Sequence, residues 1–347
     1  MKILHLLATN SFSGAENVVC QIIKMFENDN EIEMFYCSPD GQISDILKSK
    51  GIKFLPIKKI NKKNLKRIVK IIRPDIIHAH DVRASVIASN MDKHIKVISH
   101  IHGNHEKMRK ITLKSIIYEI SAKRFKKMFW VSETALKDYR FYSKVKCKSE
   151  ILVNVINKDE IIKRALQTTN DEVADIVYLG RFSEEKNPQR VYNIMKGIIE
   201  KNKDVKGCFI GDGILKENVQ KQILIDNMQN NIYIKDFLKN PMPILKKAKV
   251  LLMASRYEGT PMCVLEAMAL GVPIVSTPTD GVKDLIQNGI SGYLSENDNE
   301  LIENGIKIIE DDEYRNKLSA NVISEFNKRN NVEAYKHRLK SVYCEGE

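Results

Sequence analysis

The segment Ser255–Pro273 reads SRYEGTPMCVLEAMALGVP, the pattern of a tight turn that leads into a helix. It follows the apolar run Val250–Ala254, which predicts a buried strand. Gly259 permits the turn, Pro261 suits the first turn of a helix, and Gly271 is a typical helix stop. The segment therefore predicts one strand–turn–helix unit of an α/β fold.

Two glutamates in this segment point to a binding site. The unpaired N–H groups at the helix start, near Thr260–Cys263, form a natural site for an anion. Glu258 precedes the helix, and Glu266 lies about one and a half turns inside it, where it could reach hydroxyls of a sugar or ribose. Alternatively, Glu258 only favours the helix dipole and Glu266 only faces solvent. However, the apolar neighbours of Glu266 make an unpartnered carboxylate costly.

Short apolar runs alternate with amphipathic stretches such as Ala15–Phe26 and Leu65–Ile72, which predicts parallel β-α-β units. The strands expected in the first series are Ile3–Leu7, Ile32–Cys37, Asp75–Ala79, Val97–Ile101, Met128–Val131 and Ile151–Val153. The strands expected in the second series are Ile176–Leu179, Gly207–Ile210, Ile232–Ile234, Val250–Ala254, Pro273–Ser276 and Gly292–Leu294. The polar stretch Gln167–Asp171 predicts a linker. We thus expect domains at 1–166 and 167–325 whose strand ends face a central cleft, followed by a terminal helix over 326–347.

Composition excludes several protein classes. The chain has 347 residues, 43% hydrophobic and 29% charged, which excludes a disordered protein. Six cysteines without a C-x-x-C pair indicate reduced thiols in the cytoplasm. No segment has 18 consecutive apolar residues, so we expect no transmembrane helix. The apolar run at the start of the chain is too short for the hydrophobic region of a signal peptide. The net charge is +12 overall but +15 over residues 1–170, which suggests an anionic partner such as a membrane surface, nucleic acid or phosphorylated substrate.

Basic residues concentrate between residues 107 and 129, among apolar ones. They are Lys107, Arg109, Lys110, Lys114, Lys123, Arg124, Lys126 and Lys127. This pattern predicts a basic amphipathic helix that contacts anionic lipid. Alternatively, the helix is solvated and packs its apolar side on the sheet. We expect no nucleic-acid binding, because the segment has few aromatic residues and no known recognition motif.

Loops after two strands of the second series have the composition of phosphate sites. Tyr178–Pro188 reads YLGRFSEEKNP, in which Gly180 allows a turn and Arg181 and Lys186 suit a diphosphate, unless this is an ordinary basic loop. Gly211-Asp212-Gly213 follows another strand and is either a nucleotide-side loop or a plain turn. A dinucleotide fingerprint is excluded there, because no third glycine follows.

The stretch around Glu258 and Glu266, with its continuation over 277–294, closely resembles the E-x7-E segment of family 4 retaining glycosyltransferases, which have the GT-B fold of two Rossmann-like domains. The resemblance implies that Glu266 binds the nucleotide ribose and Glu258 lies by the donor sugar. It also implies that Arg181 and Lys186 hold the donor pyrophosphate and neutralise the leaving group. The remaining donor-binding residues that it implies are Gly14, Gly180, Gly211, Gly213, Gly259, Thr260, Pro261, Met262 and Cys263.

Two loops of the first series are also similar to family segments. In TNSFSGAE, residues 9–16, only Gly14 carries over from the family's pair of adjacent glycines, because Ser13 takes the first place. In ISHIHGNH, residues 98–105, the resemblance makes His102, more than His100, a catalytic contact of the donor sugar or acceptor. A metal site there would want carboxylate or cysteine partners, and only Glu106 is near. His78 and His80 are expected to be structural.

The resemblance implies transfer of a hexosyl or N-acetylhexosaminyl group from a nucleotide diphospho-sugar, with retention and by same-face attack. We expect no metal and no cofactor, because the chain has no D-x-D pair and cationic side chains can neutralise the diphosphate. The acceptor expected is a lipid-linked glycan or oligosaccharide of capsule or exopolysaccharide assembly, with the enzyme peripheral on the inner face of the cell membrane. The alternatives are a small soluble acceptor such as a sugar phosphate, a sugar-nucleotide epimerase, or a nucleotide-sugar-binding protein without turnover.

Overall fold

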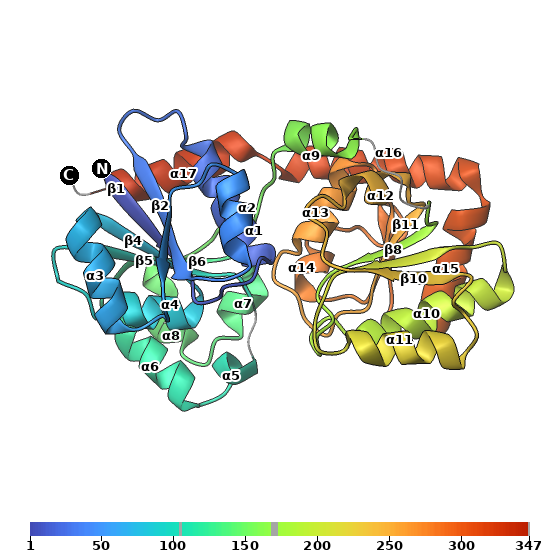
Figure 1. The fold of residues 1–347 in the computed structure, drawn as a ribbon, viewed down its shortest axis with the longest axis horizontal. Helices are drawn as coiled ribbons and strands as arrows, with labels where there is room; N and C mark the ends of the chain where they lie inside the picture. Colours follow the sequence, from blue (N-terminus) through green and yellow to red (C-terminus); the bar gives the residue numbers. More distant parts are fainter. Residues whose placement is uncertain (104–105, 168–172, 346–347) are drawn as a thin grey trace. The chain divides into compact units, whose positions relative to one another are not determined.

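The computed structural model describes residues 1–103, 106–167 and 173–345, which form two compact units (Figure 1). Unit 1 consists of Met1–Val155 and Val332–Glu347, and unit 2 of Ile156–Asn331. Each unit is a parallel sheet with helices packed on it, which confirms the two Rossmann-like domains predicted from the alternation of apolar runs.

The sheet of unit 1 has seven strands in the order β3-β2-β1-β4-β5-β6-β7. The strands are β1 (Lys2–Leu6), β2 (Glu33–Pro39), β3 (Phe54–Ile57), β4 (Ile76–His80), β5 (Lys96–Ile101), β6 (Phe125–Trp130) and β7 (Ser149–Ile151). The helices are α1 (Gly14–Met25), α2 (Ile43–Ser49), α3 (Lys62–Ile72), α4 (Asp81–Ala88), α5 (Glu106–Arg109), α6 (Leu113–Ala122), α7 (Glu133–Lys137), α8 (Tyr142–Val145) and α17 (Val332–Cys344).

The sheet of unit 2 has six strands in the order β10-β9-β8-β11-β12-β13. The strands are β8 (Ile176–Leu179), β9 (Gly207–Ile210), β10 (Ile232–Lys235), β11 (Val250–Met253), β12 (Ile274–Ser276) and β13 (Gly292–Leu294). The helices are α9 (Lys158–Ala165), α10 (Pro188–Lys201), α11 (Lys216–Ile225), α12 (Met242–Lys247), α13 (Met262–Ala269), α14 (Asp280–Lys283), α15 (Asp298–Glu310) and α16 (Asp312–Arg329).

The strand order of each sheet reverses once, and this reversal positions the candidate site. In unit 1 the chain moves outward from β1 through β2 and β3, then returns to build β4 on the other side of β1. In unit 2 the same reversal lies between β8 and β11. Loops that follow the two central strands run to opposite faces of such a sheet, so ligands bind outside the carboxyl ends of those strands.

One strand and two domain boundaries differ from the sequence predictions. Strand β3 was not expected, because its run FLPI is short, contains Pro56 and lies half-exposed at the sheet edge. Unit 2 begins at residue 156 and not at 167, because α9 packs in this unit, where the carbonyl of Arg164 accepts a hydrogen bond from Asn240 Nδ2 at 2.9 Å. Residues 168–171 of the expected linker lie outside the described residues. The segment that belongs to unit 1 starts at 332 and not at 326.

The single basic helix expected between residues 107 and 129 is wrong. Helix α5 ends at Arg109, α6 occupies Leu113–Ala122, and the rest of the segment is strand β6. Thr112 separates the helices, and its hydroxyl caps α6 by accepting a hydrogen bond from the Ser115 N–H at 3.1 Å. The last part of the segment, Phe125–Trp130, forms a strand because its aromatic residues favour strands and are buried in the sheet.

Helix α17 closes one face of the unit 1 sheet. The Arg338 guanidinium donates two hydrogen bonds to the Glu150 carboxylate, at 2.6 and 2.7 Å, and Lys127 pairs with the same carboxylate at 2.6 Å. The Arg338 hydrogen bond, opposed by burial, holds the pKa of Glu150 down at about 2. Leu339 is fully buried on the inner side of the helix.

Replacing Leu339 with Ala is expected to lower the free energy of unfolding by about 2–5 kcal/mol, because it leaves a cavity under α17. Urea denaturation measures the change. His337→Ala, at an exposed position of the same helix, is the control and should change it little. A Leu339→Ala chain as stable as the control would contradict this packing.

Candidate active site

The loops that follow β8 and β11 carry most of the predicted donor-binding residues of unit 2. Gly180 and Arg181 directly follow β8, and Glu258 follows the neighbouring strand β11. The loop after β9 packs closely on the first of these: a Cβ on Gly211, whose φ is +149°, would lie 2.0 Å from the Gly180 carbonyl oxygen. Gly213 lies two residues further along this loop, where its N–H bonds Asp212 Oδ1 at 2.8 Å. These glycines allow the two backbones to pass in contact.

A buried ion pair joins the loops at the centre of unit 2. The Lys186 ammonium donates to both carboxylate oxygens of Glu258, at 2.6 and 2.7 Å, and Ser255 Oγ donates to Oε1 at 2.7 Å. Glu258 is 7% exposed. Burial lowers the pKa of Lys186, but the charge of Glu258 outweighs it, and the pKa lies above its ordinary value. Lys186 is therefore a fixed, fully protonated cation.

The Arg181 guanidinium is the accessible cation of this group. Its side chain is 56% exposed and pairs with Glu185 at 2.7 Å. The backbone near it is fixed, because the Tyr178 hydroxyl donates to the Arg181 carbonyl at 2.6 Å and Arg256 N–H donates to the Glu185 carbonyl at 2.8 Å. The exposed guanidinium thus lies on a rigid backbone, where an anion can reach it beside its partner Glu185.

The turn before α13 is covered by the short helix α14. A Cβ on Gly281 would lie 1.1 Å from the Gly259 carbonyl oxygen, so the two backbones touch. The turn residues Gly259, Thr260, Pro261 and Met262 are buried, and Cys263 is partly exposed. Glu266 is 7% exposed on α13, where the sequence places it among apolar neighbours. Burial raises the pKa of Cys263 to about 12, which keeps this thiol protonated.

The loop after β1 is built around a glutamate that the sequence did not single out. Ser13 precedes α1, which starts at Gly14. The Glu16 carboxylate accepts hydrogen bonds from the Ser13 N–H at 3.0 Å and from the hydroxyls of Ser13 and Thr9. Ser13, which replaces the family's first glycine, therefore completes a capping box. The spacing Ser-x-x-Glu was the signal that could have shown it.

His102 lies in unit 1 at the end of a row of buried histidines. His80 Nδ1 is 2.8 Å from His102 Nε2, and the backbone N–H of His102 donates to Asp81 Oδ1 at 3.1 Å. Asp81 has a φ of +64°, a strained value for a residue other than glycine. His100 is fully buried and faces this row, as His78 and His80 do. Of the histidines in this row, only His102 is partly exposed.

The missed member of this row is His5, on β1. Parallel pairing sets His5 beside His78 and His80 beside His100, and side chains two residues apart share one face of a strand. The alternating spacings His78-x-His80 and His100-x-His102 carried this signal. The register that unites them with His5 comes from strands far apart in the sequence.

Helix α6 exposes apolar side chains. From the sequence alone, these side chains could also have packed against the sheet. Five residues on and just before it are between 37% and 75% exposed: Ile111, Leu113, Ile116, Ile117 and Ile120. The basic residues around them are Lys107, Lys110, Lys114 and Lys123. We call these nine residues the α6 patch. None of the described helices is long and apolar enough to cross a membrane.

The other basic residues of the segment have partners within unit 1. Lys126 and Lys127 lie on β6, where Lys126 Nζ donates to the Val342 carbonyl at 2.9 Å and Lys127 pairs with Glu150. Arg109 pairs with Asp138 at 3.0 Å, and Arg124 donates to the Asp92 carbonyl at 3.3 Å. Lys126 and Lys127 are thus structural and not part of the exposed surface.

The row of histidines makes stability depend on pH. Burial lowers the pKa of His5 to about 3 and the pKa values of His78, His80 and His100 well below 6.5. Below pH 6.5 the unfolded chain therefore binds more protons than the folded one, and stability falls as the pH falls. The limiting slope is about 1.4 kcal/mol per pH unit for each histidine. We expect urea denaturation to show that the free energy of unfolding falls between pH 7.5 and pH 5.5. The control His94→Ala, at an exposed position, should show the same fall. A flat profile would show that the histidines are not buried and neutral.

Comparison with known proteins gives consistent matches along the chain. The family model described as Glycosyltransferase Family 4 matches residues 12–160, and the one described as Glycosyl transferases group 1 matches residues 159–325. The chain is 28% identical to an uncharacterized glycosyltransferase of Methanocaldococcus jannaschii, over 66% of this chain and 62% of that one. It is 24% identical to the UDP-Gal:alpha-D-GlcNAc-diphosphoundecaprenol alpha-1,3-galactosyltransferase of Escherichia coli, over 99% and 97%.

Solved structures share the fold. HepE of Anabaena, in complex with UDP and glucose, superposes with a TM-score of 0.86 at 16% identity and covers 99% of each chain. TarM of S. aureus, in complex with UDP among other ligands, has a TM-score of 0.77 at 12% identity. The two matched family models, the relatives and the two parallel sheets agree. The chain therefore belongs to the family 4 glycosyltransferases, which have the GT-B fold.

Proposed function

We propose that this glycosyltransferase moves a hexosyl or N-acetylhexosaminyl group from a UDP-sugar to a lipid-linked glycan, with retention of the anomeric configuration. The observation that carries the proposal is the buried Lys186–Glu258 pair beside Arg181 in unit 2. HepE is a structural neighbour in complex with UDP-glucose, which supports a UDP-sugar as donor. Surface polysaccharide assembly is the proposed setting, because a relative is an O-antigen biosynthesis glycosyltransferase of Escherichia coli.

Charge stabilisation is the main chemical task of this site. Glycosyl transfer leaves negative charge on the departing diphosphate, and preorganised cations stabilise it most effectively. Lys186 is held in place by Glu258, so it loses little conformational freedom when the diphosphate forms. Arg181 is exposed and offers a planar fork for two phosphate oxygens. The N–H groups at the start of α13 add partial positive charge.

Same-face attack fits the side chains around Glu258. Glu258 is engaged by Lys186 and Ser255, and Cys263 is held protonated by burial, so neither serves as a free nucleophile. In this proposal the acceptor oxygen bonds to the anomeric carbon on the face that the diphosphate leaves. The acceptor proton passes to the departing phosphate oxygen. Glu266 on α13 binds the ribose of the donor, and His102 contacts the sugar or the acceptor.

The proposed transfer needs no metal ion at the diphosphate. Lys186, Arg181 and the α13 N–H groups provide the positive charge that Mg²⁺ or Mn²⁺ supplies in other sites. Added Mg²⁺ or Mn²⁺ is therefore expected to leave the rate unchanged.

A lipid-linked acceptor is supported by the α6 patch. The named acceptor of the Escherichia coli relative contains diphosphoundecaprenol, a lipid carrier. On this chain, apolar side chains exposed by 37% to 75% lie among lysines, a combination that suits an anionic membrane surface. A small soluble acceptor needs no such surface, so lipid binding separates the two functions.

Lys186→Ala and Glu258→Ala are each expected to lower the transfer rate by more than about tenfold, because each removes one member of the fixed cation site. The measurement is UDP release with acceptor present. The product's anomeric configuration is assigned by NMR. Lys201→Ala and Glu303→Ala, at exposed positions of unit 2, are the matched controls. Near-wild-type rates in both site variants refute the assignment, and a wild type that binds UDP-sugar without turnover supports the non-catalytic alternative.

The double variant Leu113→Glu/Ile117→Glu is expected to reduce flotation with phosphatidylglycerol vesicles at least tenfold. Each apolar side chain contributes about 1.5–3 kcal/mol when buried, and the new charges oppose anionic lipid. Ile71→Glu alters an equally exposed apolar residue on α3 and should float as the wild type does. A wild-type chain that stays unbound to these vesicles would favour a soluble acceptor.

A further inference from the structure

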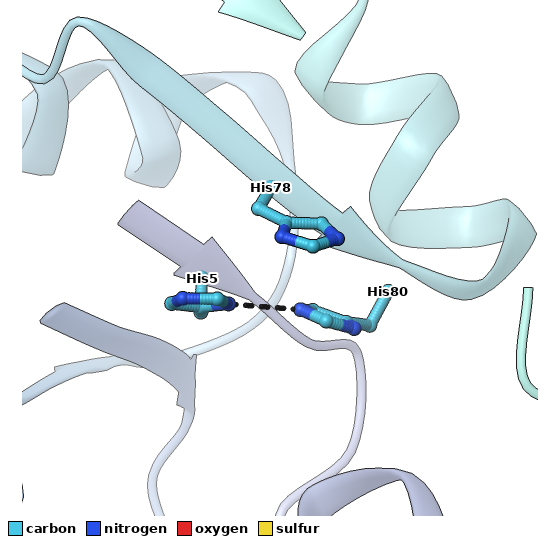
Figure 2. A group of neighbouring side chains, drawn as sticks. All are labelled: His5, His78 and His80. Carbon is cyan, nitrogen blue, oxygen red and sulfur yellow. Dashed lines mark hydrogen bonds between the residues drawn. The ribbon is translucent and has the colours of Figure 1, made fainter. Parts of the chain in front are cut away.

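Three buried imidazoles meet at the strand reversal of unit 1, in a group that the glycosyl transfer chemistry does not use. His5 comes from β1, and His78 and His80 come from the adjacent strand β4 (Figure 2). Their exposed fractions are 0%, 0% and 1%. One nitrogen of each lies within 4.8 Å of a nitrogen of both others, and His5 Nδ1 is 3.0 Å from His80 Nε2.

The outer nitrogens of these rings already have partners. The Tyr343 hydroxyl lies 2.8 Å from His78 Nδ1, His102 Nε2 lies 2.8 Å from His80 Nδ1, and Met34 Sδ lies 3.4 Å from His5 Nε2. Histidines that bind a metal typically use their other ring nitrogen in a hydrogen bond, which orients the ring. One inward nitrogen remains on each ring: His5 Nδ1 and His80 Nε2, which hydrogen-bond each other, and His78 Nε2.

The inward side is short of hydrogen bonds. His78 Nε2 has no hydrogen-bond partner although it is buried, and the same holds for both nitrogens of the adjacent His100. An unpaired buried polar group is costly, and native proteins rarely keep several together. A cation that accepts lone pairs from the three inward nitrogens would give His78 Nε2 a partner and would replace the single hydrogen bond between His5 and His80.

We propose that His5, His78 and His80 bind one divalent transition-metal ion, with zinc as its reference. Three imidazole nitrogens suit zinc, copper or nickel, and not the oxygen-preferring magnesium or calcium. Zinc sites of three histidines leave a fourth position for water or an anion.

The proposed ion is separate from the diphosphate chemistry. Its ligands lie in unit 1, on strands β1 and β4, whereas Lys186 and Glu258 lie in unit 2. It would join the two central strands of the unit 1 sheet and, through Tyr343, the covering helix α17. Its role is to stabilise unit 1.

The test uses the chain of 347 residues after chelation, titrated with ZnCl₂. We expect one zinc per chain to remain after desalting, measured by plasma mass spectrometry, and the melting temperature to rise with zinc concentration. His5→Gln and His78→Gln are expected to weaken binding at least tenfold. Tyr343→Phe, which keeps the apolar ring in the core, should weaken it about tenfold by removing the partner of His78 Nδ1. His94→Gln and His337→Gln, at exposed positions, are the controls and should bind as the wild type does.

Three outcomes would overturn the proposal. The wild type could retain no stoichiometric zinc, or His5→Gln and His78→Gln could bind like the controls. Binding that is lost in His102→Gln but kept in His5→Gln would assign the ion to the neighbouring group of His80, His100 and His102 instead. Lys186→Ala should bind zinc normally while transfer fails, so the failure of one proposal does not decide the other.

Discussion

The reversal of strand order is the constraint on which both candidate sites depend. It lies between β1 and β4 in unit 1 and between β8 and β11 in unit 2. At such a point consecutive connections leave the sheet on opposite faces, so side chains at the two strand ends meet without a helix between them. Lys186 and Glu258 are brought together in this way in unit 2, whereas in unit 1 His5 lies beside His78 because β1 and β4, the strands on either side of the reversal, pair in register.

Burial affects the charge of the side chains differently at the two sites. In unit 2 a lysine would lose its charge on burial, and the facing carboxylate of Glu258 keeps it protonated. In unit 1 no carboxylate bonds the rings of His5, His78 and His80 among the described residues, and burial keeps them neutral. A fixed cation suits a departing diphosphate, whereas neutral imidazoles suit a metal ion. The same fold thereby provides two chemically different environments.

Helix α6 shows that an amphipathic sequence pattern does not by itself tell which apolar residues are buried. Ile116, Ile117 and Ile120 have the spacing of a core-facing helix, yet each is at least 37% exposed, while Tyr118 of the same helix is fully buried. The helix instead packs inward through Ser115, Tyr118, Ser121 and Ala122. Phe125, which belongs to the same apolar pattern, is buried because it starts β6.

The sequence by itself determined the alternation of strands and helices, and the segment around Glu258 and Glu266 with its Arg181 and Lys186 loop. These features are local, because apolar periodicity and turn residues act over a few neighbours. Only the tertiary structure decided that His5 lies beside His78, that Tyr343 reaches His78 from α17, and that Lys186 meets Glu258. The hydrogen-bonded pairs among these residues are 72 and 265 positions apart in the sequence. Strand order and register bring such distant residues together, and no local sequence pattern encodes either of them.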